Sequence, residues 1–408
     1  MSTAPVPVLA GLRVVEFSAF VAAPSAGLAL AQLGADVIRV DPRGGNIDIA
    51  RWPVNAQGAS LYWASLNRGK RSVELDVRSP RGRQLFQDLI TAPGEDAGIF
   101  LTNLGVDGEL GYEALSAKRP DLIMVQLIGS PDGANALDYT VNSACGYPLV
   151  TGDGHEPVNH VLPAWDLLAG MTLATAILAA VHRRRIDGTG QFVRLALSDV
   201  AMAATSALGY IADVQVNGTE RKADGNYLYG AYGDAFATAD GRRVMVVAIS
   251  ERQFTALIRA TGMLAALQSS ADALGYRLDS EAGRFEAREL ISAFLRPWFG
   301  KRTLAQVGEA LTDKAILWGP YRTFRQMIEE DRRCSEWNPM FRSVEHPGYG
   351  TFLTSRSPLS FGASANVPPA AGPGLGQHGD DVLGSVLGLD EAARASLRAD
   401  GVLGGRKA

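Results

Sequence analysis

The sequence predicts an α/β fold in which helices cover both faces of a parallel sheet. Short apolar runs alternate with helical patterns through the first third of the chain, as in sheets built from strand–helix units. The chain has 408 residues, 47% of them hydrophobic and 20% charged, which suits a globular protein of two or three domains with a large core. After about residue 215 the pattern changes, and a smaller α+β domain is expected over 225–325.

The individual elements follow from local patterns. Buried strands are expected where apolar residues run together, at 13–17, 36–40, 72–77, 98–102, 122–127 and 192–197. Helices are expected at 24–33, at 80–89 with proline in the first turn, and at about 167–184 with basic residues in the last turn. In the smaller domain, Asp240-Gly241 is a hairpin turn, and the helices expected after it lie at about 251–262, 284–298 and 303–312. A final helical region is expected at 379–400.

Charge and composition exclude several classes of protein. A net charge of −4 argues against a general polyanion-binding role, so we expect no nucleic-acid partner. Two cysteines and five scattered histidines show no disulfide or metal-ligand spacing, so we expect no bound metal. The N-terminus lacks a targeting pattern, and the apolar stretch 167–181 is shorter than a membrane span. We therefore expect a cytoplasmic enzyme with no membrane partner.

Two loops are candidates for ligand binding. The turn after the first strand, Ser18–Pro24, has no glycine, whereas dinucleotide folds use glycines there to admit a pyrophosphate. Nicotinamide or flavin binding is therefore not expected. The loop 67–72 (NRGKRS) gathers three cationic side chains around Gly69, which suits a phosphate-bearing ligand. A solvated turn explains the same residues equally well.

Asp166 stands at the start of the long apolar helix, in PAWDLLAG. An aspartate there is commonly a helix N-cap, and the residues alone favour that role. The alternative is a carboxylate nucleophile held at the positive end of the helix. His160 lies six residues earlier, and we favour a structural histidine over a catalytic pairing.

Four separate blocks carry a resemblance that runs almost from end to end. They are GLRVVEFSAFVAAPSAGLALAQLGADVIRVDPRGG, LNRGKRSVELDVRSPRGRQLF, LPAWDLLAGMTLATAILAAVHRRRIDGTGQFVRLALSDV and GPGLGQHGDDVLGSVLGLD. Their order and spacing resemble the class III CoA transferases, the family of formyl-CoA transferase, carnitine CoA transferase and α-methylacyl-CoA racemase. The resemblance implies a Rossmann-like, CoA-binding large domain assembled from 1–215 and 330–408. It also implies an interlocked homodimer.

The resemblance also implies a set of site residues. By position, Asp166 corresponds to the family's catalytic aspartate, and Asp138 would support it. The implied CoA contacts are Val21, Ala22, Arg43, Arg68, Gly69, Lys70, Arg71, Asn103, Leu104 and Gly105. A loop of the small domain would act as a lid over the substrate through Asn226, Tyr227, Tyr229 and Gly230. Coenzyme A enters as part of the acyl-CoA substrate, so no separate cofactor is implied.

Further stretches narrow the expected reaction. VNHVLPAWD, GNYLYGAYG and WGPYRT resemble the family members that move CoA between the two carboxyl groups of one C5 unsaturated diacid. This implies an intramolecular CoA transferase, formally an isomerase, that works through an aspartyl-CoA thioester. An intermolecular transferase between an acyl-CoA and a free carboxylic acid is the alternative, since it shares every residue above. A 2-methylacyl-CoA racemase is disfavoured, because the family's racemases have a His-Asp pair where this sequence has Leu137-Asp138.

Overall fold

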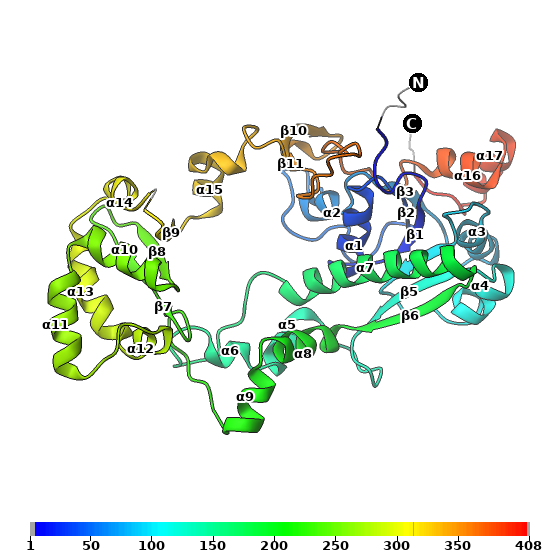
Figure 1. Ribbon diagram of the computed structural model, residues 1–408. Coiled ribbons are helices and arrows are strands. Elements are labelled where there is room, and N and C mark those ends of the chain that lie inside the picture. Colours follow the sequence, from blue (N-terminus) through cyan, green and yellow to red (C-terminus); the bar gives the residue numbers. More distant parts are fainter. Residues whose placement is uncertain (1–4, 313, 406–408) are drawn as a thin grey trace. The chain divides into compact units, whose positions relative to one another are not determined.

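The computed structural model describes residues 5–312 and 314–405, which form two compact units (Figure 1). Unit 1 comprises Met1–Cys145, His160–Asn217 and Arg332–Ala408. Unit 2 comprises Gly146–Asn159 and Gly218–Asp331. The expected domain boundaries leave 146–159 in the large domain, but this segment joins unit 2, where Gly152 forms a β-bridge with Gly225.

A six-stranded parallel sheet is the centre of unit 1. Its strands are β1 (Arg13–Phe17), β2 (Asp36–Asp41), β3 (Arg71–Glu74), β4 (Ile99–Thr102), β5 (Ile123–Ile128) and β6 (Gln191–Ala196). They lie in the order β3-β2-β1-β4-β5-β6, with every neighbouring pair parallel. This confirms the predicted α/β class. The chain order reverses between β1 and β4, so the loops after these strands diverge and open a crevice at their carboxyl ends.

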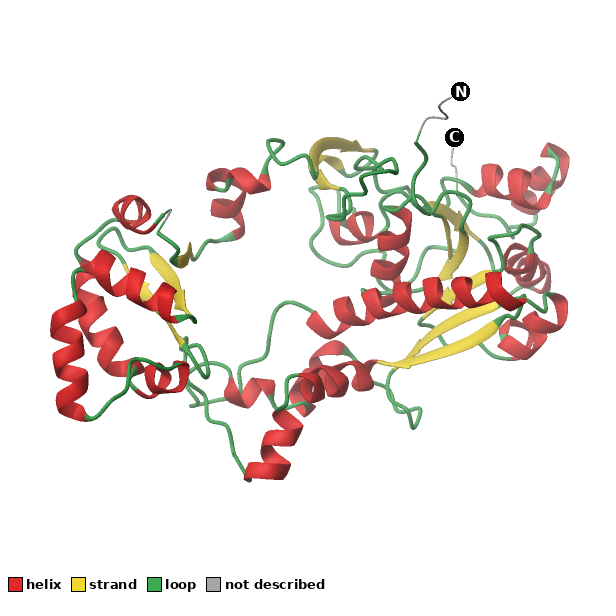
Figure 2. Cartoon of the chain, viewed as in Figure 1, coloured by secondary structure: helices red, strands yellow, loops and turns green. Residues whose placement is uncertain are grey.

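Helices cover both faces of this sheet (Figure 2). One face carries α1 (Ala22–Ala31) and the long α7 (Ala164–Asp187). On the other face, an apolar core lies between the sheet and the helices α3 (Pro80–Thr91), α4 (Tyr112–Lys118), α16 (Gly379–Leu387) and α17 (Glu391–Ala399). The remaining elements of the unit are α2 (Leu61–Leu66), α5 (Asp138–Ala144), α8 (Leu197–Ala207), α9 (Tyr210–Asn217), and the hairpin of β10 (Phe341–His346) and β11 (Gly350–Ser355), with single 3₁₀ turns at Gly108–Leu110 and Arg332–Cys334.

Helices α1 and α7 pack closely because small residues face each other. A Cβ atom on Gly170 of α7 would lie 1.9 Å from Ser25 Oγ and 2.8 Å from Ala22 O, both in α1. The absence of a side chain at Gly170 therefore allows the two backbones to approach. This close packing brings the first turns of α7 to the beginning of α1, directly after β1.

Helix α7 is, among the described residues, the one helix whose length and composition would suffice to cross a membrane. Its Leu173, Ile177 and Val181 are buried. Arg184 in its last turn is also buried, and its guanidinium donates to Ala97 O at 2.8 Å. These contacts are typical of a core helix in an α/β layer, which is what the sequence predicts.

Unit 2 combines a small antiparallel sheet with helices. Its strands are β7 (Tyr232–Ala237), β8 (Arg243–Ala248) and β9 (Leu317–Pro320), and the predicted hairpin turn joins β7 to β8. Its helices are α6 (Tyr147–Val150), α10 (Glu251–Thr261), α11 (Leu264–Leu274), α12 (Glu281–Glu286), α13 (Arg288–Gly300), α14 (Leu304–Leu311) and α15 (Phe324–Glu330). Phe236, Leu257, Ile291 and Phe299 lie in its separate apolar core.

Two expected helices are each divided in the structure. The region 379–400 forms α16 and α17, because Gly388 ends α16 in the left-handed conformation (φ 68°) and Asp390 caps α17 by accepting the Ala393 N–H at 2.8 Å. The region 284–298 spans the end of α12 and most of α13, which meet at Ala287.

Candidate active site

A cavity of about 390 Å³ opens at the carboxyl ends of β1, β4 and β5. It lies where the strand order reverses, the usual ligand position in open α/β sheets. Six residues predicted from the sequence line this one cavity, namely Val21, Ala22, Asn103, Leu104, Gly105 and Asp166. The rest of the lining comes from Ala19, Phe20, 126–129, 133–137 and Leu197. The structure thus brings the expected nucleophile together with five of the expected CoA contacts.

Asp166 is the third residue of α7, which begins at Ala164 with Pro163 as the N-cap. The capping role that the residues alone favour for Asp166 is therefore wrong. The capping acceptor is Asp138, whose Oδ2 accepts the backbone N–H groups of Trp165 at 2.8 Å and of Asp166 at 3.0 Å. Because another carboxylate satisfies these helix donors, the Asp166 side chain is not needed to cap the helix.

The surroundings of Asp166 raise its pKa to about 7. Burial disfavours the charged carboxylate, the nearby charge of Asp138 adds to this, and the positive charge of Arg51 opposes it. No donor in the described part of the chain forms a hydrogen bond with the Asp166 carboxylate. Near neutral pH the carboxylate form is therefore accessible and poorly solvated, which suits a nucleophile.

Asp138 also contacts a histidine. His160 Nε2 lies 2.5 Å from Asp138 Oδ1, and the neighbouring Trp165 Nε1 donates to Asn142 Oδ1 at 3.1 Å. Leu137 stands where the racemases have the histidine of their His-Asp pair, and the histidine that contacts Asp138 comes instead from 22 positions further along the chain. Neither Asp138 nor His160 lines the cavity, however, so the pair gives a racemase no acid–base group there.

The turn after β1 is held in an unusual conformation at the cavity wall. Phe20 has a φ of 63°, a left-handed value that bulky residues avoid. Asp48 Oδ2 accepts the Phe20 N–H at 3.0 Å. The Asn103 side chain forms two hydrogen bonds with the backbone of Ala19, the residue before Phe20. It accepts the Ala19 N–H at 2.9 Å and donates to Ala19 O at 2.7 Å. These bonds offset the strain and fix the turn on which Phe20 and Val21 line the site.

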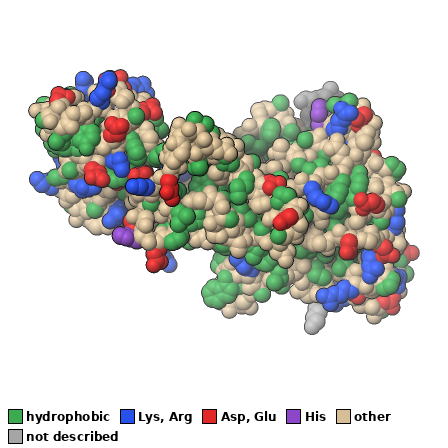
Figure 3. Space-filling model, turned by 90° about the horizontal axis from the view of Figure 1, so that it is seen from below, with side chains coloured by type: hydrophobic (Ala, Val, Ile, Leu, Met, Phe, Trp, Pro, Cys, Tyr) green, Lys and Arg blue, Asp and Glu red, His purple; other side chains and the backbone are tan. Residues whose placement is uncertain are grey.

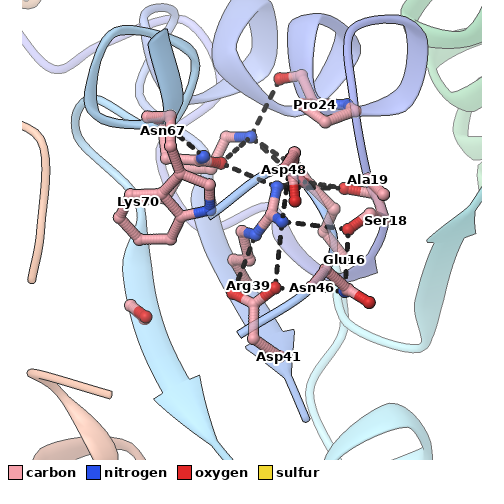
Figure 4. Close-up of polar contacts among 12 residues, drawn as sticks. Glu16, Ser18, Ala19, Pro24, Arg39, Asp41, Asn46, Asp48, Asn67 and Lys70 are labelled. Atoms are coloured by element: carbon pink, nitrogen blue, oxygen red, sulfur yellow. Dashed lines mark hydrogen bonds and ion pairs between the residues drawn. The ribbon is translucent and has the colours of Figure 1, made fainter. Parts of the chain in front are cut away.

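A buried ionic network lies beneath this turn, with Arg39 at its centre (Figure 4). The Arg39 guanidinium binds both oxygens of Asp41 at 2.9 Å, and it donates to Ser18 O at 2.9 Å. Asp48 is also close, with its Oδ2 at 3.5 Å from Arg39 Nη2, and burial raises the pKa of Asp48. The network therefore ties the turn after β1 to the ends of the neighbouring strands.

Lys70 belongs to the same network and not to the cavity (Figure 4). Its side chain is fully buried, and its ammonium donates to three acceptors at 2.8–3.0 Å, namely Glu16, Pro24 O and Asn67. Burial lowers the pKa of Lys70 to about 8 despite the attraction of Glu16. Since each of its three hydrogens has a protein acceptor, Lys70 has no donor left for a phosphate.

The other predicted basic ligands lie outside the cavity. Arg71 is paired with Asp36 at 2.5 Å and with Asp381 at 3.0 Å, and Arg43 is paired with Glu74 at 3.3 Å. The backbone N–H of Gly69 donates to Ala371 O at 3.0 Å.

Arg68 is the basic residue of the loop 67–72 whose charge is not paired with a carboxylate in the described part of the chain. Its buried Nε has no acceptor among the described residues. The guanidinium contacts Ser355 Oγ at 3.3 Å, and burial lowers its pKa. Among the loop's three cations, Arg68 therefore best fits a phosphate ligand.

The four predicted lid residues lie in unit 2, in the irregular segment before β7. The Arg288 guanidinium lies 5.5 Å from the Tyr227 ring, and the Arg221 guanidinium lies 4.0 Å from the Tyr229 ring. Asn226 and Gly230 are exposed. All these contacts are within unit 2, and the role of the segment as a lid stays a prediction.

Sequence reasoning missed Arg51 and Tyr62, which lie close to the site. Tyr62 is in α2, and Arg51 precedes that helix in a segment with no periodic pattern, so no sequence signal singles out either residue. A metal site has no counterpart in the described residues, where no three His, Cys, Asp or Glu side chains gather as ligands.

The sequence resemblance implies a Rossmann-like domain with a catalytic aspartate, and the structure has a doubly wound sheet with Asp166 in the cavity at its switch point. The chain belongs to CoA-transferase family III, whose profile matches residues 9–379. It is 51% identical to 2-methylfumaryl-CoA isomerase of Chloroflexus aurantiacus over 401 residues, 98% of each chain. It is 27% identical to succinyl-CoA–D-citramalate CoA-transferase of the same organism, over 96% of this chain and 97% of the relative.

The fold also has a close structural counterpart. The crystal structure of a CAIB/BAIF family protein from Brucella suis matches with a TM-score of 0.77, covering 94% of this chain and all of that one. The sequences are 24% identical, so this likeness concerns the fold alone.

Proposed function

We propose that this protein moves CoA between the two carboxyl groups of one C5 unsaturated diacid, converting the C1 thioester of mesaconyl-CoA into the C4 thioester. The observation that carries the choice of substrate is the 51% identity, over 98% of both chains, to 2-methylfumaryl-CoA isomerase. Asp166 in the cavity supports the chemistry, because a transferase of this kind needs a carboxylate nucleophile beside the bound thioester.

The first half of the reaction transfers CoA to the protein. The Asp166 carboxylate attacks the thioester carbonyl, forming a mixed anhydride and releasing CoA thiolate. The thiolate then attacks the aspartyl carbonyl of that anhydride. This gives an aspartyl-CoA thioester and a free dicarboxylate, so CoA is held on Asp166 while the diacid is uncoupled from it.

The second half returns CoA to the other end of the diacid. The second carboxylate attacks the aspartyl thioester, which again releases thiolate and forms an anhydride. Thiolate attack on the substrate carbonyl of this anhydride yields the isomeric thioester and restores the Asp166 carboxylate. Every atom of the substrate reappears in the product, so no acceptor acid is required.

The proposed CoA site keeps most of the residues expected from the sequence. Val21, Ala22, Asn103, Leu104 and Gly105 would contact CoA from the cavity wall. Arg68 would provide a phosphate contact outside it, since its charge is not neutralised by a neighbouring carboxylate. The assignments of Arg43, Gly69 and Arg71 rest on the family resemblance alone.

We also propose a homodimer. Helices α8 and α9 and the turn between them expose large apolar side chains, which are Met202, Leu208, Ile211, Val214 and Val216. Figure 3 views the molecule from the side on which these helices lie in Figure 1, and hydrophobic side chains are abundant on that surface. Contiguous exposed apolar residues mark surfaces that associate, which supports a subunit contact here.

An assay without acceptor tests the proposed reaction. The protein is incubated with mesaconyl-C1-CoA and isotopically labelled free mesaconate. We expect the C4 thioester to form without any added acceptor and without label entering it. Label in the product at a rate matching turnover, or product only when an acid is added, would identify the intermolecular transferase instead.

A further inference from the structure

Arg51 lies beside the cavity with its side chain held by two aromatic rings. Its guanidinium carbon is 5.6 Å from the centre of the Phe20 ring and 5.4 Å from that of Tyr62. Phe20 lines the same cavity as Asp166. The backbone of Arg51 is fixed on both sides, by an N–H bond to Asp48 O at 3.1 Å and by the Ser60 hydroxyl, which donates to Arg51 O at 2.5 Å.

The electrostatics place Arg51 near the nucleophile. The charge of Arg51 lowers the pKa of Asp166 against the effects of burial and of Asp138. Tyr62 has its pKa raised to about 12, mainly by burial, and the charges of Asp166 and Asp48 contribute while Arg51 opposes them. The charge of Asp166 therefore interacts with both Arg51 and Tyr62.

Arg51 differs from the other cations beneath the turn after β1. Arg39 and Lys70 are buried and bound by carboxylates, whereas Arg51 is exposed and has no carboxylate within 4 Å in the described part of the chain. The nearby carboxylate of Asp48 is already engaged by the Phe20 N–H and lies close to Arg39. The Arg51 side chain also forms a hydrogen bond with the Tyr62 hydroxyl, and the remaining donors of its fork are available for an anion that enters the cavity.

The proposed reaction supplies such an anion. The substrate carries one free carboxylate beside its thioester, and the diacid released after the first half-reaction carries two. Only one of these reacts with Asp166 at a time. The other carboxylate needs a positive partner, because the site also contains the charges of Asp138 and Asp166. A guanidinium is well suited to this, since its fork binds a carboxylate through two parallel hydrogen bonds.

We propose that Arg51, supported by the rings of Phe20 and Tyr62, is an anion subsite that binds the non-esterified carboxylate of the diacid beside Asp166. The inference rests on the proposed function and adds a reason for its intramolecular course. A diacid held by Arg51 stays in the cavity while CoA is on Asp166, and it exchanges its two carboxylates between the two positions. The strained backbone of Phe20 then serves to place its ring beneath this arginine.

The test compares a diacyl-CoA with a monoacyl-CoA on Arg51→Gln, Arg51→Lys and the wild type. The two probes are mesaconyl-C1-CoA and 2-methylcrotonyl-CoA, which has a methyl group in place of the free carboxylate. The CoA that hydroxylamine releases from the protein, after free acyl-CoA has been removed by gel filtration, reports formation of the aspartyl thioester from either probe. Both probes are measured at the same pH, because a change in the ionisation of Asp166 affects the two probes alike and leaves their ratio unchanged. Arg78→Gln, an exposed arginine of unit 1 outside the cavity lining, is the control.

We expect Arg51→Gln to reduce the selectivity ratio for the diacyl over the monoacyl probe by about 10- to 100-fold, the value of losing a hydrogen bond to a charged group. Free diacid should also escape during turnover. Arg51→Lys should retain part of the selectivity, and Arg78→Gln all of it.

Two outcomes would overturn the inference. An unchanged ratio in folded Arg51→Gln would remove Arg51 from carboxylate binding, and an equal loss on both probes would place it on a phosphate of CoA. Both are distinct from failure of the proposed function, in which the wild type itself produces no C4 thioester without an acceptor.

Discussion

Burial has two opposing effects on the reactivity of Asp166. A buried carboxylate without hydrogen-bond donors is a stronger nucleophile than a hydrated one, and the same burial raises its pKa to about 7. The poor solvation makes the Asp166 carboxylate more reactive. The raised pKa reduces the fraction of Asp166 that is in the reactive carboxylate form at low pH. The fold maintains this compromise through Asp138, which caps α7 and simultaneously repels the charge on Asp166.

The raised pKa of Asp166 predicts that the free energy of unfolding depends on pH, an effect that can be measured without an activity assay. In the folded state Asp166 titrates near 7, above its ordinary value of 3.8, so the folded form binds its proton more tightly. The folded protein therefore loses stability from this group as pH rises from about 4 through 7. Asp166→Asn removes this loss.

We expect the gain in unfolding free energy of Asp166→Asn over the wild type to be larger at pH 8 than at pH 4, by about 1–3 kcal/mol. Urea denaturation of the ligand-free proteins at the two pH values measures it. An equal difference at both pH values would show that Asp166 has an ordinary pKa in the folded protein.

The residues predictable from the sequence are those that belong to a pattern. Asp166 stands at a marked helix start, and Asn103 follows a recognisable strand. Lys70 has the appearance of an exposed basic residue, and only the tertiary structure shows it enclosed by Glu16 and Asn67. Arg51 and the contact between Asp138 and His160 could not be predicted, because they depend on loops whose course no local pattern determines.

At the scale of elements, the strands of the parallel sheet were the most predictable part. Most are short segments rich in apolar residues, since both faces of such a sheet are covered, although Glu16 interrupts β1 and Arg39 interrupts β2. Boundaries differ by a few residues, and α7 extends from Ala164 to Asp187, beyond the expected range at both ends. The hairpin of β10 and β11 was missed because most of its residues are at least partly exposed and polar residues interrupt its pattern.

At the scale of the whole molecule, the resemblance supplied what periodicity could not. Strand–helix alternation predicts a parallel sheet but not its strand order, and the order determines where β1 and β4 separate. The alternation of strands and helices also does not show that residues 332–405, which include α16 and α17, complete the core of unit 1. These contacts join segments from opposite ends of the chain.

The proposed homodimer predicts the effect of a charge placed on α9. Light scattering after size exclusion should give the wild type the mass of two chains. Val214→Glu should weaken the dimer, because a buried carboxylate at an apolar contact has no partner. Ile186→Glu, which changes an equally exposed apolar residue at the end of α7, is the matched control and should leave the mass unchanged. A monomeric wild type, or equal effects of the two substitutions, would contradict the proposed contact.

The central claim is that CoA passes through a thioester on Asp166. The most direct measurement is mass spectrometry of the peptide containing Asp166 after the reaction with mesaconyl-C1-CoA is stopped by acid. We expect this peptide to gain the mass of CoA less one water, to convert to a hydroxamate with hydroxylamine, and to remain unmodified in Asp166→Ala, which should form no C4 thioester. Product formation at the normal rate by Asp166→Ala, or a CoA adduct on another residue, would contradict the account.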